Sequence, residues 1–252
     1  MQYDSGRDFW WLLLRPWIAI PRLIQVLWTL SGLVIVLLLR GSSSDADVQR
    51  GLARRILNTL TGLGPCFIKL GQALSTRPDL VRRDWLEELT RLQDDLPAFP
   101  HSIALSRIEQ ELGAPAEQLF EEFPSAPIAA ASLGQVYKAR LEGQSWVAVK
   151  VQRPNLTFIL RRDLVLIRAL GVLTAPFLPL NLGFGLGSII DEFGRSLFEE
   201  IDYEQEADNA ERFATLFADN PAVYVPRVER MLSSTHVLTC LLYTSPSPRD
   251  RG

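Results

Sequence analysis

Lys150 ends a short run of alternating residues, and its type and position suit contact with phosphate. The run Val147-Ala148-Val149-Lys150 has the period of two expected of a strand, so one face points to a core and the lysine points to the other. An ammonium group there can contact a nucleotide phosphate as a point charge if a carboxylate holds it. Only three of the 26 basic residues are lysines, so a lysine is not this chain's default surface cation. A solvent-facing strand lysine is the alternative.

A loop of small residues precedes this strand and predicts a turn over the same cleft. Glycine lets backbone amides approach a phosphate because it has no Cβ, and three alanines in a row partly block that approach. We therefore expect this loop to bind a nucleotide with an affinity different from that of an ordinary glycine loop. A plain hairpin turn with no ligand is the alternative. The candidate cofactor-binding residues are Lys150 and the loop residues Ala129, Ala130, Ala131, Ser132, Gly134 and Gln135.

Two further polar groups could supply partners for lysines. Lys69 and Gln72 lie within one helical turn of an otherwise apolar run, where buried polar groups would need partners. Asp202 and Glu206 are four residues apart and share a helix face, whereas Glu200 points elsewhere. The carboxylates therefore point in two directions, enough to serve two lysines, and a solvated acidic helix is the alternative.

These side chains must be positioned by a mixture of helices and strands. Helical periodicity runs from residue 46 to about 96 and again over 102–112. The segment 117–151 has the shorter period of strands, and residues 156–173 and 187–217 are again helical. The order predicts an α+β fold in which an antiparallel sheet carries Lys150.

The N-terminal segment is the most apolar part of the chain. Residues from Leu23 to Leu39 contain one strongly polar side chain, Gln25, and are flanked by Arg22 and Arg40. Their number is at the lower limit for a membrane-spanning helix, for which about 20 residues are usual. Three interpretations stay open: a spanning helix, a helix in the membrane interface, and a helix buried against the protein.

Composition excludes several classes of function. The 252 residues carry a net charge of −3, which gives no reason to expect nucleic acid as a partner. Cys66 and Cys240 are the only cysteines, and neither has metal-ligand spacing around it. We therefore expect no disulfide framework and no metal site built from protein ligands.

Together the motifs resemble those of the UbiB/AarF family of atypical kinase-like proteins. The matching series is Lys-x-Gly-Gln at Lys69, the Ala-Ala-Ala-Ser-x-Gly-Gln loop, Val-Ala-Val-Lys at Lys150, and Glu-x-Asp-Tyr-x-x-Glu from Glu200 to Glu206. The resemblance implies a protein-kinase-like N-terminal lobe, with an antiparallel sheet and helices, preceded by a helical extension. It also implies ATP and Mg²⁺ as cofactors, with Lys150 on the α and β phosphates and Glu206 paired to it. The spacing also permits Glu200 to face Lys150 instead. The remaining site residues it implies are Lys69, Gln72, Glu200 and Asp202, with Lys69 engaged by the last two.

The same resemblance implies a membrane-associated protein whose globular part is cytoplasmic. Its activity would be that of an ATPase or a small-molecule or lipid kinase, a transferase. Its role would lie in isoprenoid-quinone biosynthesis, such as that of ubiquinone or plastoquinone, or in lipid homeostasis. Its partners would be membrane lipids, quinone precursors and proteins of a biosynthetic complex. A non-catalytic membrane-tethered adaptor is the alternative function.

The expected organisation has four parts: an apolar segment and linker (1–44), the helical extension (45–116), the kinase-like lobe (117–239) and a disordered, non-native tail (240–252). A kinase also needs a catalytic-loop aspartate and a metal-binding Asp-Phe-Gly after this lobe. Neither occurs here, so the sequence predicts a fragment without the C-terminal lobe and without activity of its own.

Overall fold

The computed structural model describes residues 3–41, 43, 45–76, 85, 90, 97–143, 145–177 and 185–242. Their packing forms two compact units, and each is described by itself. The sheet unit contains residues 97–154 and 199–242. The helical unit contains the described residues before 97 together with 155–198.

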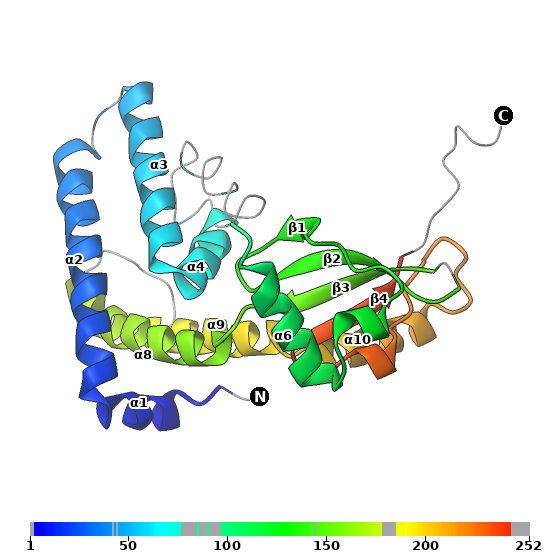
Figure 1. Cartoon of the computed structure of the whole chain (residues 1–252). Helices are drawn as coiled ribbons and strands as arrows, with labels where there is room; N and C mark the ends of the chain where they lie inside the picture. The colour runs from blue at the N-terminus through cyan, green and yellow to red at the C-terminus, as the bar shows by residue number, and fades with distance from the viewer. Residues whose placement is uncertain are drawn as a thin grey trace. The chain divides into compact units, whose positions relative to one another are not determined.

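The sheet unit is built on four antiparallel strands in the order β1-β2-β3-β4 (Figure 1). Its strands are β1 (Ala129–Ala130), β2 (Gly134–Arg140), β3 (Trp146–Gln152) and β4 (Val237–Leu241). Its helices are α6 (His101–Leu112), α7 (Ala116–Leu119), α10 (Tyr203–Leu216) and the short 3₁₀ helix η3 (Arg230–Leu232). In the register of β3, Lys150 lies between Val136 on β2 and Leu238 on β4.

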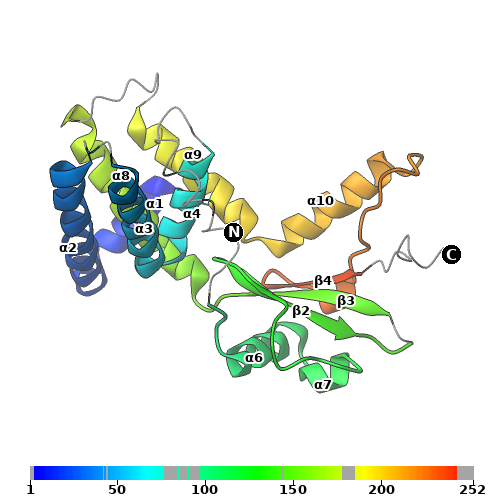
Figure 2. The ribbon, with the colours of Figure 1, turned by 90° about the horizontal axis from the view of Figure 1, so that it is seen from above.

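The two faces of the sheet have different partners. Alternate residues of β3, Val147, Val149 and Val151, are fully buried in a core with Ile108 of α6 and Phe120 beyond α7. The other face, which carries Lys150, is covered by α10. Figure 2 shows α6 and α7 on one side of the sheet and α10 on the other. The period of two therefore places the lysine under α10 and keeps the valines in the core.

The helical unit consists of α1 (Ser5–Leu13), α2 (Pro16–Arg40), α3 (Ala46–Leu63), α4 (Pro65–Ser75), α8 (Leu156–Thr174), the 3₁₀ helix η2 (Ala175–Phe177) and most of α9 (Leu186–Glu200) (Figure 1). A buried ion pair connects α2 with α8. Arg22 donates from Nε and Nη2 to the two carboxylate oxygens of Asp163, at 2.9 and 2.7 Å, and also donates to the carbonyl of Leu63. Arg162 contacts the same carboxylate at 2.8 Å, so this buried charge is paired.

Helix α2 is long and apolar enough, by length and composition, to cross a membrane, with a mean hydropathy of 2.1 over its most apolar window. It is the one such helix within the described parts of the chain. It contains the whole segment from Leu23 to Leu39, for which the sequence leaves three interpretations open.

Two helices expected to be continuous are interrupted, and each break has a local cause. The first lies at Gly64, whose φ of 101° ends α3 before Pro65 begins α4. The second lies between α9 and α10, where Asp202 adopts an extended conformation and caps α10 by accepting from the amide of Gln205 at 3.2 Å. The uninterrupted helix predicted for 187–217 is therefore wrong.

The α+β class is confirmed, but some boundaries differ from those expected. Strand β4 continues to Leu241, so Cys240 and Leu241 pair with β3 and are not part of a tail. Helix α6 packs on the sheet, and α8 belongs to the helical unit, so the units are not contiguous along the chain as the expected boundaries at 116 and 239 imply. Residues 243–252 and nearly all of 77–96 lie outside the described residues.

Candidate functional site

Lys150 and Glu206 form an ion pair between β3 and α10. The Nζ atom of Lys150 donates to Oε2 of Glu206 at 2.7 Å and to Oε1 at 3.1 Å. The side chains are 33% and 43% exposed, so solvent reaches the pair while α10 limits the directions in which the lysine can point. The predicted contact is present, and Glu206, not Glu200, is the carboxylate that makes it.

The start of α10 is held in place by the end of β3. Gln152 is buried, and its Nε2 donates to the carbonyl of Ile201 at 2.7 Å. The next residue, Asp202, caps α10, which places Glu206 one turn into the helix between the sheet-facing Tyr203 and Ala207. The strand that carries the lysine therefore also positions the helix that carries its partner.

Tyr203 lies beneath the ion pair. The Nζ atom of Lys150 is 4.5 Å from the centroid of its ring, a distance suited to a cation–π contact. Burial, reinforced by the charges of Glu206 and Glu200, raises the pKa of Tyr203 above its usual range, so the phenol stays neutral. Its hydroxyl is buried and finds no hydrogen-bond partner among the described residues.

Gly134, the first residue of β2, is packed against the same tyrosine. A Cβ atom at this position would lie 2.7 Å from the carbonyl oxygen of Val151 and 2.8 Å from the hydroxyl of Tyr203. Both distances are shorter than a carbon–oxygen contact allows, and neither neighbour is the end of a flexible side chain. Glycine at this position is therefore required by close packing.

The alanine loop is fixed by Arg153, which follows β3. Its backbone amide donates to Leu133 at 2.9 Å, and its Nε donates to the carbonyl of Ala131 at 3.0 Å. Its Nη2 donates to the carbonyl of Pro97 at 2.7 Å, and burial lowers the pKa of the guanidinium from its usual value. Of the loop residues, Ala129 and Ala131 are exposed, Ala130 is half-buried, and Ser132 is buried.

The structure gives the side chain of Gln135 a structural role. It is fully buried, and its amide both accepts from the backbone nitrogen of Phe99 at 3.0 Å and donates to the hydroxyl of Tyr137 at 2.5 Å. The side chain therefore anchors the segment before α6 to β2. Its side-chain polar atoms are therefore occupied on the core side of the sheet, and its predicted contact with a nucleotide stays a prediction.

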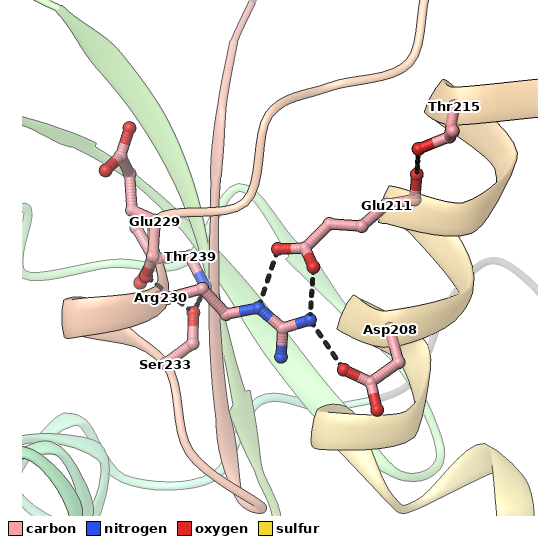
Figure 3. A network of polar contacts seen from close by, with 7 residues as sticks. All are labelled: Asp208, Glu211, Thr215, Glu229, Arg230, Ser233 and Thr239. Carbon is pink, nitrogen blue, oxygen red and sulfur yellow. Dashed lines mark hydrogen bonds and ion pairs between the residues drawn. The ribbon is translucent and has the colours of Figure 1, made fainter. Parts of the chain in front are cut away.

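A second set of contacts fixes α10 to the segment before β4 (Figure 3). The Nε and Nη2 atoms of Arg230 donate to both carboxylate oxygens of Glu211 at 2.7 Å, and Nη2 also donates to Asp208 at 2.6 Å. Next to it, Ser233 Oγ accepts from the amide of Thr239 at 3.0 Å. The hydrogen bond from Arg230 lowers the pKa of Glu211 below its usual value. The network fastens the helix that carries Glu206 to the strand that borders Lys150.

The other predicted site residues are placed as follows. Lys69 and Gln72 lie on α4 in the helical unit and are half-buried. Glu200 is the last residue of α9, and Asp202 is the cap of α10, both in the sheet unit. The expected contact of Lys69 with these carboxylates joins two separately described units, so it stays a prediction.

Four residues of the site were missed: Gln152, Arg153, Tyr203 and Arg230. The first two did leave a signal, because a glutamine and an arginine lie two and three residues after Lys150, at the end of the same strand. The partners of Gln152 and Arg153 are backbone carbonyls, which carry no sequence signature. Within the described ranges, no group of three or more His, Cys, Asp or Glu side chains could hold a metal ion.

Comparison with known proteins gives a consistent match. The family model of the ABC1 atypical kinase-like domain matches residues 91–247. The uncharacterized protein slr1919 of Synechocystis sp. is 48% identical over 226 residues, which are 89% of this chain and 40% of that protein. The chloroplastic protein ACTIVITY OF BC1 COMPLEX KINASE 1 of Arabidopsis thaliana is 44% identical over 224 residues, 87% of this chain and 32% of that protein.

A solved structure also resembles this chain. It is the erythromycin complex of Rv3197 from Mycobacterium tuberculosis, with a TM-score of 0.50 and 30% identity, covering 81% of this chain and 51% of that one. The chain spans 40% and 32% of the lengths of the two curated relatives above.

Proposed function

The chain belongs to the ABC1 atypical kinase-like family, and we propose that its sheet unit binds ATP with Mg²⁺ on the face that carries Lys150. The observation that carries this proposal is the ion pair in which Lys150 contacts both carboxylate oxygens of Glu206, adjacent to the alanine loop. A lysine held by a helix carboxylate is how kinase-like folds present a positive charge to the α and β phosphates.

The residues present fit a nucleotide phosphate. Glu206 fixes the direction of the Lys150 ammonium group. The Lys150 side chain is one-third exposed, so a ligand can reach it. Arg153 holds the loop carbonyl of Ala131 and thereby fixes the loop that would close over the phosphates. When bound, ATP supplies the phosphoryl group and its Mg²⁺ offsets phosphate charge.

For the whole protein we extend the proposal to ATP hydrolysis or to phosphoryl transfer to a small molecule or lipid. Support comes from the family and from the kinase names of the plant relatives. The proposed setting is a membrane, in support of isoprenoid-quinone biosynthesis or lipid homeostasis, because α2 is long and apolar. A neighbouring structure was solved with erythromycin, so small-molecule binding should be tested here too.

Titration of the 252-residue chain with Mg-ATP, followed by calorimetry, tests the nucleotide proposal. Lys150→Met should weaken binding by about 10- to 100-fold, because a charge-assisted hydrogen bond contributes roughly 1.5–3 kcal/mol. Lys138→Met is the matched control, since Lys138 is exposed on β2 and its ammonium lies 4.5 Å from the ring of Trp146. Equal binding by both variants would refute the assignment of Lys150.

The rival function is a non-catalytic membrane-tethered adaptor. It is favoured by one observation, the exposed apolar side chains of α1 and α2, among which Trp17 and Trp28 are prominent. Vesicle binding by a chain that shows no heat of Mg-ATP binding would favour the adaptor. Binding of both would retain the kinase-like proposal.

A further inference from the structure

Helices α1 and α2 carry a continuous apolar face that no described residue covers. Exposed apolar side chains at positions 17, 24, 28, 35 and 38 follow one another along α2 at intervals of seven, four, seven and three, which places them on one side of that helix. We call this the outer face: Trp10 (61% exposed) and Leu14 (70%) near α1, with Trp17 (71%), Ile24 (61%), Trp28 (81%) and Leu38 (79%) on α2.

The opposite side of α2 is packed against protein. Val26 and Leu33 are buried there, and Arg22 makes the bidentate ion pair with Asp163 of α8. A helix surrounded by lipid would have no such protein-facing side. Helix α2 therefore has one face for the helical unit and one face for another partner.

The position of helix α3 limits the ways in which α2 can contact a bilayer. Helix α3 lies beside α2 along much of the length of α3 (Figures 1 and 2). Its other side exposes Arg50, Arg54 and Arg55. If α2 crossed the hydrocarbon with α3 beside it, these three charges would enter the hydrocarbon too, where each is strongly disfavoured.

We propose that α1 and α2 lie in the plane of a phospholipid surface, with the outer face in the interfacial region and α3 outside the hydrocarbon. Tryptophan is the side chain that favours this depth. The charge of these helices also fits an anionic surface, because residues 4–40 contain four arginines and two aspartates in a chain of net charge −3. The inference rests on the membrane setting proposed above and selects among the three orientations of α2.

Flotation with vesicles of phosphatidylcholine and phosphatidylglycerol tests whether the outer face binds lipid. Trp28→Glu should lower the vesicle-bound to free ratio by about tenfold, because it places a charge in the apolar contact. Asn58→Glu on the exposed side of α3 is the matched control and should leave the ratio unchanged. The proposal would be overturned if the chain did not bind vesicles and instead sedimented as a dimer that Trp28→Glu dissociates. That result would assign the outer face to a second copy of the chain.

Labelling with a membrane-impermeant maleimide tests the orientation in sealed membranes. Arg7→Cys and Arg40→Cys stand near the two ends of the α1–α2 segment. Native Cys66 is buried, and the half-buried native Cys240 is replaced by serine in both variants. An in-plane arrangement exposes both new thiols on the same side, whereas a spanning helix exposes them on opposite sides, which would overturn the proposal. Mg-ATP binding by Trp28→Glu is measured separately, so failure of lipid binding and failure of the nucleotide proposal give different results.

Discussion

Substitution of Gly134 by alanine should strain the site at a defined place. The new Cβ would lie 2.7 Å from the carbonyl oxygen of Val151 and 2.8 Å from the hydroxyl of the fully buried Tyr203. Overpacking of this kind costs about 1–3 kcal/mol. The smaller conformational freedom of alanine in the unfolded chain offsets roughly 0.5–1 kcal/mol of that cost. At the midpoints of these two ranges we expect a net destabilisation of about 1.3 kcal/mol, located at the junction of β2, β3 and α10.

Hydrogen exchange measured by mass spectrometry is the appropriate assay, because two units can open separately and a global unfolding curve would mix them. Protection of peptides from β2 and β3 should fall by about tenfold, the factor that corresponds to this free energy. Gly51→Ala is the matched control: its Cβ would meet nothing within 4 Å on α3, so the same chemical change should increase protection of that helix.

A second substitution identifies the cause of the strain. Tyr203→Phe removes one of the two close contacts and also removes a buried hydroxyl that has no partner among the described residues. The Gly134→Ala/Tyr203→Phe double variant should therefore regain part of the lost protection. If Gly134→Ala retained the protection of the parent chain, or if the double variant were no better than the single one, the packing explanation would be refuted.

Three further predictions concern ion pairs and hydrogen bonds. Arg153→Met should loosen the alanine loop, so loop peptides should exchange faster while those of α6 are unchanged; equal exchange in the loop would contradict the role given to Arg153. Arg22→Met should lower the free energy of unfolding of the helical unit by about 3 kcal/mol. This is the low end of the range for a broken buried ion pair, because Arg162 still contacts Asp163. Faster hydrogen exchange in peptides from α2 and α8 should reveal the loss. The pKa of Glu211 should lie below that of an ordinary glutamate in an NMR titration, and should return to the ordinary value when its guanidinium partner is removed. Because the pKa of Glu211 is lowered in the folded chain, its ion pair with Arg230 stabilises the fold fully at pH values above the ordinary glutamate pKa. That stabilisation is lost as the pH falls through the lowered pKa.

Much of the site could be predicted from local pattern. The alternation that ends in Lys150 predicts a strand with the lysine on the face opposite the valines, which the structure confirms. The acidic stretch predicts a helix with a carboxylate available to that lysine, and Glu206 makes the contact. Both predictions depend only on the periods of strands and helices.

Other features could not be predicted, because their partners are distant in sequence or have no signature. The carbonyl of Ile201 is 49 residues from Gln152, and nothing in either segment indicates that they meet. The partner of the Gln135 side chain is another such case, because its amide binds the backbone of Phe99, 36 residues away. A polar side chain in a motif can serve a ligand or the backbone, and only the packed structure distinguishes the two.

Local patterns in the sequence were enough to predict the types of element, the segments that carry the lysine and carboxylates, and the motifs of an atypical kinase. Only the folded chain shows that Glu206 and not Glu200 holds Lys150, that a Cβ at Gly134 would be overpacked, and that one face of α2 is packed against protein. The difference follows from the range of the interactions. Periodicity and capping act within a few residues and can be seen in the sequence, whereas close packing and the pairing of buried polar groups depend on segments that become neighbours only on folding.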